Sequence, residues 1–441
     1  MQVKSKINQL DPILGSLRFN TLAQWLDWQE KLHFTSIELG LERCMTVLKR
    51  MQLDNPDFAV ISVAGTNGKG SSVCMLRNIL QQAGYKTGSY TSPHLIRYNE
   101  RICINGIEVE DDLLCNAFER IDRARGDVSL TYFEFGTLAA IDIFQRAGVE
   151  IAVLEVGLGG RLDAVNCLDA DVALIAAIDL DHENWLGSDR ESIGLEKAGI
   201  MRSGKPAVCS DQDPPQSVIK HAKSLDTRLS LAGHEYHFSE QGNAWSWNST
   251  KSGFKNLPKP SIYNPQQINN AAGVLMALEE ISDRFPVPED AIRKGLLEFN
   301  LYGRFQVIPD KAQLILDVAH NPQSAKLLVG NLRSLPIKGK THMIIGMLKD
   351  KNHQAVLGEF IKVVDNWHLV TLENPRGSGF GMLEEQLKLL GVTENISTYA
   401  TVAEALETVR DRVSPQDRIV VTGSFLTVGA AITFLKEKIQ P

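Results

Sequence analysis

The chain lacks the features that mark a membrane, secreted or nucleic-acid-binding protein. No apolar run approaches the roughly 18 residues of a membrane span, and residues 1–19 contain no apolar signal-peptide core. The six cysteines form no Cys-x-x-Cys pair, which argues against a zinc site and fits reduced, buried thiols. No run of Lys and Arg is present, and the net charge is −7, so we expect no nucleic-acid partner. These absences predict a soluble cytoplasmic protein that holds anionic ligands in local sites.

Residues 60–72 have the pattern of a phosphate-binding loop. A β-branched run breaks at Gly65–Gly70, and a helical pattern begins near residue 72. Glycines allow backbone N–H groups to face an anion, a helix N-terminus adds partial positive charge, and Lys69 supplies a full charge. The strict P-loop has glycine where Val63 stands and Ser or Thr where Gly70 stands. We therefore predict a shortened loop that binds a nucleoside triphosphate; the alternative is an ordinary strand-to-helix turn.

Polar residues stand at or just after the ends of further predicted strands. They include Ser92, Glu155 and His182. A triphosphate site needs a divalent cation, and these residues, together with Ser71, are candidate ligands. The alternatives are that Glu155 pairs with Arg161 in the core, and that His182 is a loop histidine, because imidazole is an uncommon ligand of Mg²⁺.

Lys197 is predicted to lie on an apolar helix face. Ser188–Glu191 has the pattern of a capping box, so a helix is expected to run to Gly199, with Ile193 and Lys197 on one side. Burial favours the neutral amine. A neutral amine can react with carbon dioxide to form a carbamate, which resembles a carboxylate as a metal ligand. The alternative is a lysine whose stem crosses apolar surface while its ammonium reaches water.

The order of predicted elements indicates two α/β domains. Strands and helices alternate at βαβ spacing through the first 200 residues, including a strand over 172–178. Residues 205–265 are less regular, and a second α/β alternation begins near residue 303. With 441 residues the chain can hold two cores. We predict an α/β fold in which residues 1–300 form a P-loop-type ATP-binding domain with a mostly parallel sheet. Residues 301–441 are expected to form a smaller Rossmann-like domain.

Seven ordered motifs, spread over nearly the whole chain, together resemble folylpolyglutamate synthase of the Mur ligase superfamily. They are Gly65–Gly70, Thr91-Ser-Pro-His-Leu95, Leu154–Asp163, Asp181-His182, Glu196-Lys-Ala-Gly199, Gly303-Arg-Phe305 and Asp317-Val-Ala-His-Asn-Pro322. An eighth segment, Leu130–Gly136, resembles the bifunctional bacterial members, which are dihydrofolate synthases as well.

The resemblance implies a role for each matching residue. The implied metal ligands are Ser92, Glu155, His182 and a carbamylated Lys197, and the implied ATP contacts are Thr66, Asn67, Gly68, Lys69, Gly70, Ser71, Asn270, Arg304 and Asp317. Dihydropteroate would contact Lys31, Leu32, His33, Phe34, Thr131, Tyr132, Phe133, Glu134, Leu162, Asp163 and Ala164, and glutamate would contact His320 and Ser424. Lys69, His182, Lys197 and His320 would form the catalytic set. Lys31 and Phe34 depart from the small polar residues expected in a pterin loop, and by its pattern alone the aromatic helix from Tyr132 is core.

The implied activity is that of an ATP-dependent ligase that uses Mg²⁺, with two ions. It would join L-glutamate to dihydropteroate and to the glutamate tails of reduced folates through an acyl phosphate. The expected partners are these small molecules, with no membrane, and the protein is expected to be a monomer. The alternatives are a monofunctional dihydrofolate synthase, a Mur-type peptide ligase and a nucleotide-dependent switch. A Mur-type peptide ligase would carry a UDP-sugar domain before the loop, and a switch would not need the second domain.

Overall fold

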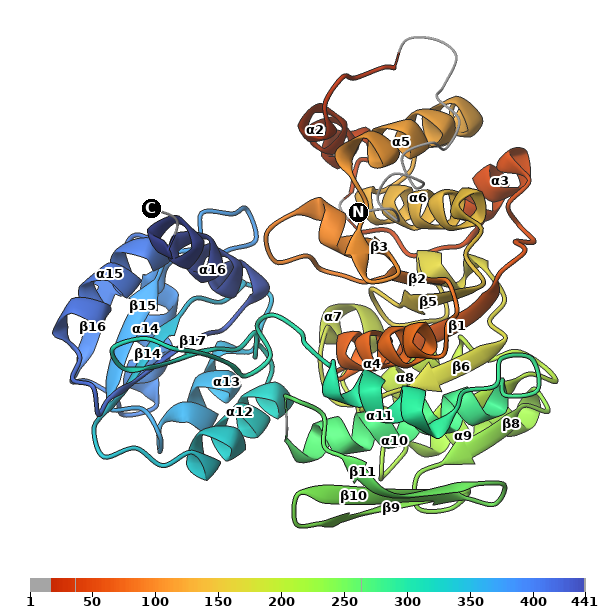
Figure 1. Cartoon of the computed structure of the whole chain (residues 1–441). Helices are drawn as coiled ribbons and strands as arrows, with labels where there is room; N and C mark the ends of the chain where they lie inside the picture. The colour runs from red at the N-terminus through yellow and green to blue at the C-terminus, as the bar shows by residue number, and fades with distance from the viewer. Residues whose placement is uncertain (1–16, 36, 263, 440–441) are drawn as a thin grey trace. The chain divides into compact units, whose positions relative to one another are not determined.

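The protein was analysed as a computed structural model that describes residues 17–35, 37–262 and 264–439. Most of the segment in which we predict no signal peptide, residues 1–16, lies outside the described residues. The chain divides into two compact units, coloured from red to green and from green to blue in Figure 1. The first unit comprises the chain up to His94 together with Tyr98–Asp179 and Leu186–Phe299. The second comprises Leu95–Arg97, Leu180–Trp185 and the chain from Asn300.

An eight-stranded sheet in the order β4-β3-β2-β5-β1-β6-β7-β8 forms the centre of the first unit. Its strands are β1 (Ala59–Ala64), β2 (Thr87–Tyr90), β3 (Ile102–Ile104), β4 (Ile107–Glu108), β5 (Ile151–Glu155), β6 (Val172–Ile175), β7 (Pro206–Cys209) and β8 (Arg228–Leu231). The neighbouring strands of the run β2-β5-β1-β6-β7-β8 pair in parallel. Strand β3 pairs antiparallel with both β2 and β4. The predicted mostly parallel sheet is therefore confirmed.

Helices cover both faces of this sheet. They are α2 (Leu22–Leu32), α3 (Glu42–Met51), α4 (Lys69–Gln82), α5 (Asp111–Arg125), α6 (Tyr132–Ala147), α8 (Arg190–Ala198), α9 (Gln216–Ser224), α10 (Pro265–Glu280) and α11 (Glu289–Leu297). Residues of α6 and α8 share one core with this sheet, whereas α4 contacts β2 and β5, and α10 contacts β6 and β7, on the other face. Because both faces are covered, the residues of β1 and β5 are all buried, which is why these strands are continuous apolar runs in the sequence.

Smaller elements complete the first unit. They are the short helices η1 (Tyr98–Arg101) and η2 (Ala164–Cys167) and the antiparallel sheet of β9 (Tyr236–Gln241), β10 (Ala244–Ser249) and β11 (Gly253–Pro258). The short helix α7 (Glu183–Leu186) belongs to the second unit except for its last residue, Leu186. No helix among the described residues is both long enough and apolar enough to cross a membrane. All six cysteines are free thiols, as expected.

Three local predictions are corrected by the structure. Helix α4 begins at Lys69 rather than near residue 72, because Gly68 takes a left-handed φ of 88° and serves as the N-cap. Helix α8 is capped by Asp189 rather than Ser188, since the Asp189 carboxylate accepts a 2.8 Å hydrogen bond from the Ser192 N–H. Strand β6 ends at Ile175, three residues earlier than predicted.

The second unit is built on a six-stranded sheet in the order β12-β13-β17-β14-β15-β16. Its strands are β12 (Gln306–Ile308), β13 (Gln313–Leu316), β14 (Thr341–Ile345), β15 (Asn366–Val370), β16 (Ile396–Tyr399) and β17 (Arg418–Thr422), and its helices are α12 (Pro322–Ser334), α13 (His353–Phe360), α14 (Phe380–Leu389), α15 (Val402–Arg412) and α16 (Phe425–Ile439). All pairings except β12 with β13 are parallel. Alternate strand residues enter two separate cores, one under α15 and α16 and one under α12, α13 and α14.

Candidate active site

The loop between β1 and α4 has the shape expected of a phosphate cradle. Gly68 takes a left-handed φ and α4 starts directly after it, so the unpaired N–H groups of the first helical turn point back toward the loop. The Lys69 ammonium donates to the carbonyl oxygens of Gly65 at 2.8 Å and Thr66 at 3.2 Å. The Thr66 hydroxyl donates to the Asp179 carbonyl oxygen at 2.9 Å, which ties the loop to the segment after β6.

Asn270, on α10, lies against this loop. Its Oδ1 would be only 2.6 Å from a Cβ added to Gly68. Gln267, one turn earlier on α10, accepts a hydrogen bond from the Asn270 amide at 3.1 Å and donates to the Ser71 hydroxyl at 3.2 Å. The structure thus brings together two residues predicted to contact ATP from distant parts of the sequence. Gln267 was missed by sequence reasoning, although its place three residues before Asn270 puts it on the same face of the helix.

Ser92 and Glu155 meet at the carboxyl ends of β2 and β5. The Ser92 N–H donates to Glu155 Oε2 at 3.4 Å, and Glu155 is 5% exposed. Arg161 pairs with Glu196 at 2.8 Å, so the alternative of a core pair between Arg161 and Glu155 is wrong. A carboxylate and a serine hydroxyl are oxygen donors of the kind that Mg²⁺ and Mn²⁺ prefer, and the backbone contact brings the two residues together. Among the described residues no group of three His, Cys, Asp or Glu side chains stands ready to hold a metal.

Lys197 is buried on the face of α8 that we predicted. It is 3% exposed, and Ile193 on the same face is fully buried, so the ammonium does not reach water as a surface lysine would. Gly160 lies directly against this turn of α8: a Cβ there would be 2.7 Å from the Glu196 carbonyl oxygen and 3.0 Å from the Lys197 Cα. The glycine therefore permits the strand-end loop to approach the backbone that carries Lys197.

The segments predicted to bind dihydropteroate are partly brought together. Lys31 pairs with Asp27 on the exposed side of α2, and Phe34 is 84% exposed with its ring 4.5 Å from that of His33. Leu32 and Phe133 are half-buried and pack on the core. Tyr132 is half-buried too, whereas Phe135 and Phe144 of the same helix are fully buried, so the core interpretation holds for the rest of this helix.

A charged network that sequence reasoning missed joins two of these segments. His33 Nε2 lies 2.8 Å from Glu38 Oε2, and Glu38 pairs with the guanidinium of Arg43. Arg43 reaches Glu134 at 3.0 Å, and Glu134 accepts from the Thr131 N–H at 2.7 Å as part of the capping box of α6. Little in the sequence signalled this network, because Glu38 and Arg43 stand among other charged residues such as Glu42.

The third segment, residues 162–164, is held by backbone contacts. The Leu162 carbonyl oxygen accepts from the Gly40 N–H at 3.0 Å. Asp163 is buried, with its carboxylate accepting from the N–H groups of Leu158 at 2.8 Å and Val165 at 3.0 Å. Burial raises the pKa of Asp163 to about 7, against the effect of these hydrogen bonds. Ala164 is buried beside it.

The predicted residues of the second unit surround the end of β13. Burial raises the pKa of Asp317, whose carboxylate accepts from the N–H groups of Phe305 and Ala319 at 2.8 Å each. The Arg304 guanidinium lies 5.1 Å from the centre of the Phe425 ring. Ser424 is buried and accepts from the Thr427 N–H at 3.0 Å, as an N-cap of α16 would. His320 Nδ1 donates to the Val318 carbonyl oxygen at 2.8 Å, so Nε2 faces away from the backbone.

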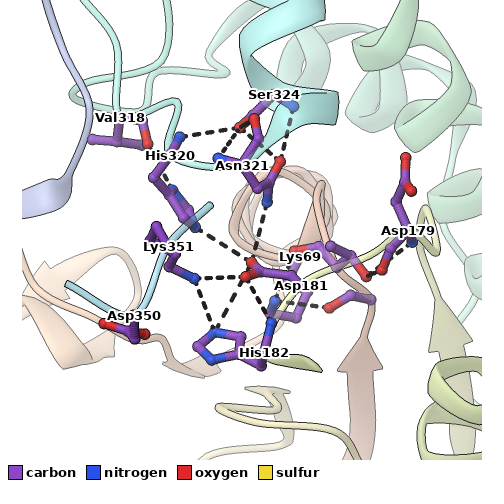
Figure 2. A network of polar contacts seen from close by, with 12 residues as sticks. Lys69, Asp179, Asp181, His182, Val318, His320, Asn321, Ser324, Asp350 and Lys351 are labelled. Carbon is purple, nitrogen blue, oxygen red and sulfur yellow. Dashed lines mark hydrogen bonds and ion pairs between the residues drawn. The ribbon is translucent and has the colours of Figure 1, made fainter. Parts of the chain in front are cut away.

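Asp181 and His182 belong to the second unit, where they meet a lysine that sequence reasoning missed (Figure 2). The Lys351 ammonium lies 2.6 Å from Asp181 Oδ1 and 3.4 Å from His182 Nε2. Burial opposes ionisation of Asp181, yet the His320 imidazole, with Nε2 at 3.6 Å, and the charge of Lys351 hold its pKa well below the usual range. A signal was available, since Lys351 follows β14 in the way that the other predicted site residues follow their strands.

A glycine-rich phosphate loop at the carboxyl edge of a parallel sheet, with a second α/β unit, defines a nucleotide-dependent enzyme of two domains. Residues 63–258 match the family model "Mur ligase middle domain", and residues 303–425 match "Mur ligase, glutamate ligase domain". The dihydrofolate synthase/folylpolyglutamate synthase of Escherichia coli (strain K12) is 43% identical over 407 residues, which are 92% of this chain and 94% of that protein. The Haemophilus influenzae protein of the same name is 38% identical over 92% of this chain and 96% of its own length.

Solved structures agree with these sequence matches. The structure of E. coli FolC in complex with DHPP and ADP aligns with a TM-score of 0.91 at 41% identity, covering 96% of this chain and 100% of that one. A bifunctional folylpolyglutamate synthase/dihydrofolate synthase with Mn, AMPPNP and L-glutamate bound aligns with a TM-score of 0.88 at 42% identity, with the same coverage. The chain belongs to the dihydrofolate synthase/folylpolyglutamate synthase family of Mur ligases, as the motifs indicated.

Proposed function

We propose that the protein is an ATP-dependent ligase that adds L-glutamate to 7,8-dihydropteroate, giving dihydrofolate, and to the glutamate tails of reduced folates. The main support is the loop from Gly65 to Lys69, with its left-handed Gly68 and the buried Asn270 beside it, in a chain whose second unit matches a glutamate ligase domain. E. coli FolC binds ADP and DHPP, and another relative binds AMPPNP and L-glutamate.

The reaction would begin with attack of the acceptor carboxylate on the γ-phosphorus of ATP, which forms an acyl phosphate and releases ADP. The amine of L-glutamate then attacks the acyl carbon, phosphate leaves, and an amide bond remains. The protein would contribute mainly position and charge: the N-terminus of α4 and the Lys69 ammonium would offset the negative charge of the phosphates.

Divalent metal ions would assist at this site. We assign them as two Mg²⁺ ions, held by Ser92, Glu155, His182 and a carbamylated Lys197, a set of oxygen donors with one imidazole. When bound, Mg²⁺ would neutralise part of the phosphate charge. The burial of Glu155 and Lys197 supports this assignment, because neither residue is exposed to solvent as a charged surface residue would be.

The remaining assignments follow the motifs. We assign Thr66–Ser71, Asn270, Arg304 and Asp317 to ATP, and His320 and Ser424 to glutamate. Residues 31–34, 131–134 and 162–164 are assigned to dihydropteroate, with the exposed Lys31 and Phe34 contributing from outside the buried network. We also propose that residues 1–300 and 301–441 are the functional domains and that the enzyme acts as a monomer in the cytoplasm.

The test is a product assay with two acceptors. Incubation with ATP, Mg²⁺, L-glutamate and dihydropteroate is expected to release ADP in a glutamate-dependent manner and to yield dihydrofolate. A Lys69→Met variant serves as the negative control. If the unmodified chain forms neither ADP nor dihydrofolate, the proposal is wrong. If dihydrofolate forms but tetrahydrofolate gains no further glutamate, the protein is a monofunctional dihydrofolate synthase.

A further inference from the structure

Asp181 is the centre of a polar network within the second unit (Figure 2). Its Oδ1 accepts from the Lys351 ammonium at 2.6 Å, and its Oδ2 accepts from the Asn321 amide at 3.1 Å and faces His320 Nε2 at 3.6 Å. The side chains of Lys351 and Asp181 are 6% and 10% exposed. A close ion pair at this depth holds its geometry more firmly than a surface pair, because water competes less for either partner.

The same carboxylate also shapes the backbone at His182. Asp181 Oδ1 accepts a 2.8 Å hydrogen bond from the His182 N–H. His182 has a φ of 52°, in the left-handed region that residues other than glycine enter at a cost of about 1 kcal/mol or more. Such a conformation persists only where the surroundings hold it. The Lys351 ammonium binds the carboxylate that accepts this N–H, and it lies 3.4 Å from His182 Nε2 on the other side of the residue.

We infer that Lys351 is a positioning residue: through Asp181 it fixes the left-handed turn at His182 and thereby the direction of the imidazole. The inference rests on the proposed function, in which His182 is a metal ligand. When Nε2 takes a cation, the ammonium keeps its shorter contact with Asp181, and the lysine charge stays balanced. Asn321 holds the opposite oxygen of the carboxylate, so the loop of residues 180–185 is pinned from two sides.

The position of Lys351 in the chain fits this role. It lies in the loop between β14 and α13, where its neighbour Lys349 uses its ammonium for the Pro375 carbonyl oxygen at 3.0 Å instead. The two lysines of this loop therefore have different partners. Lys351 contacts the loop that carries His182, whereas Lys349 contacts a backbone carbonyl of a neighbouring loop. Lys349→Met is accordingly a matched control for Lys351→Met.

The experiment measures Mn²⁺ binding by the full-length protein in the presence of AMPPNP, from the electron paramagnetic resonance signal of free Mn²⁺. Lys351→Met is expected to weaken Mn²⁺ binding about 10-fold or more, the range seen when a residue that orients a metal ligand is removed. Lys351→Arg should recover part of the affinity, and Lys349→Met should bind as the unmodified chain does. Metal-free ADP binding should be unchanged in all variants.

Because Lys351→Met leaves the Asp181 carboxylate without its cation, the variant could lose its fold. The double variant Lys351→Met/Asp181→Asn removes both charges and is expected to show the same loss of Mn²⁺ affinity with intact thermal unfolding. Unchanged or tighter Mn²⁺ binding in either variant would overturn the inference, as would a parallel loss of metal-free ADP binding. In those cases the two-acceptor assay of the unmodified chain still decides the proposed function separately.

Discussion

The side-chain oxygen of Asn270 occupies the space that a side chain at residue 68 would need, since a Cβ on Gly68 would lie 2.6 Å from Asn270 Oδ1. Asn270 is 1% exposed and is held by Gln267, so it has little room to move. The two residues are about 200 positions apart in the sequence, and their contact places α10 against the loop.

Replacing Gly68 with alanine is therefore expected to weaken ADP binding by about 10-fold or more, because strain at a left-handed φ costs about 1–2 kcal/mol and Asn270 must be displaced as well. Isothermal titration calorimetry with ADP is the measurement. Gly84→Ala is the control: its φ of 95° is also left-handed, but no atom lies within 4 Å of the added Cβ. Equal ADP affinity in the two variants would show that the contact with Asn270 is unimportant.

Lys197→Ala is expected to abolish turnover, because a buried carbamate supplies a ligand that alanine cannot replace. A short carboxylic acid added in solution should then restore part of the activity in the dihydropteroate assay, since its carboxylate can occupy the vacated space. Full activity of the alanine variant without added acid would refute the carbamate role.

Gly160→Ala tests whether the backbone of α8 positions Lys197. The added Cβ would meet the Glu196 carbonyl oxygen at 2.7 Å, and backbone atoms cannot give way as a flexible side chain can. We expect a loss of about 1–3 kcal/mol in the free energy of unfolding by urea, together with a reduced kcat. Gly330→Ala, in the interior of α12 with open space around the added Cβ, should leave kcat unchanged and raise the free energy of unfolding by up to about 1 kcal/mol, since alanine favours a helix. A fully active and stable Gly160→Ala variant would contradict the close packing described.

Two neighbouring histidines, the buried His368 and the half-buried His342, predict a pH dependence of stability. His342 Nδ1 lies 3.2 Å from His368 Nε2, and burial lowers the pKa of His368 from 6.5 to about 4. Between those two values the unfolded chain binds more protons than the folded one. The free energy of unfolding should therefore fall as the pH falls from about 6.5 to 4, with the share of His368 reaching about 2 kcal/mol at pH 5.

The check is urea unfolding of the unmodified chain and of His368→Phe at pH 7 and pH 5. The variant should lose about 2 kcal/mol less between the two values, because phenylalanine does not titrate. His234→Phe is the control, since His234 is an exposed residue of the turn before β9 in the first unit. An identical loss of stability in the unmodified chain and in His368→Phe would show that this histidine is not protonated on unfolding.

Much of the fold was predictable because its signals are local. The sheet of the first unit is mostly parallel, and the phosphate loop lies between a strand and a helix, as expected. The errors were local too: the start of α4 depended on the φ of Gly68, which a glycine permits without requiring. Lys351 and Gln267 were missed because their importance comes from partners far away in the chain.

By itself the sequence determined the class of fold, the strand ends that carry polar residues, and the family, because hydrophobic period, glycine placement and ordered motifs are properties of neighbouring residues. Only the tertiary structure decided that Asn270 crowds Gly68, that Arg161 pairs with Glu196 rather than with Glu155, and that Asp181 binds Lys351. A charged or amide side chain could pair with several residues of the same sequence. Tertiary packing decides which of them lies close enough and is buried enough to become its partner. The loop at Gly65–Gly70 could be predicted from the sequence. The residues that hold its surroundings in place could not be predicted.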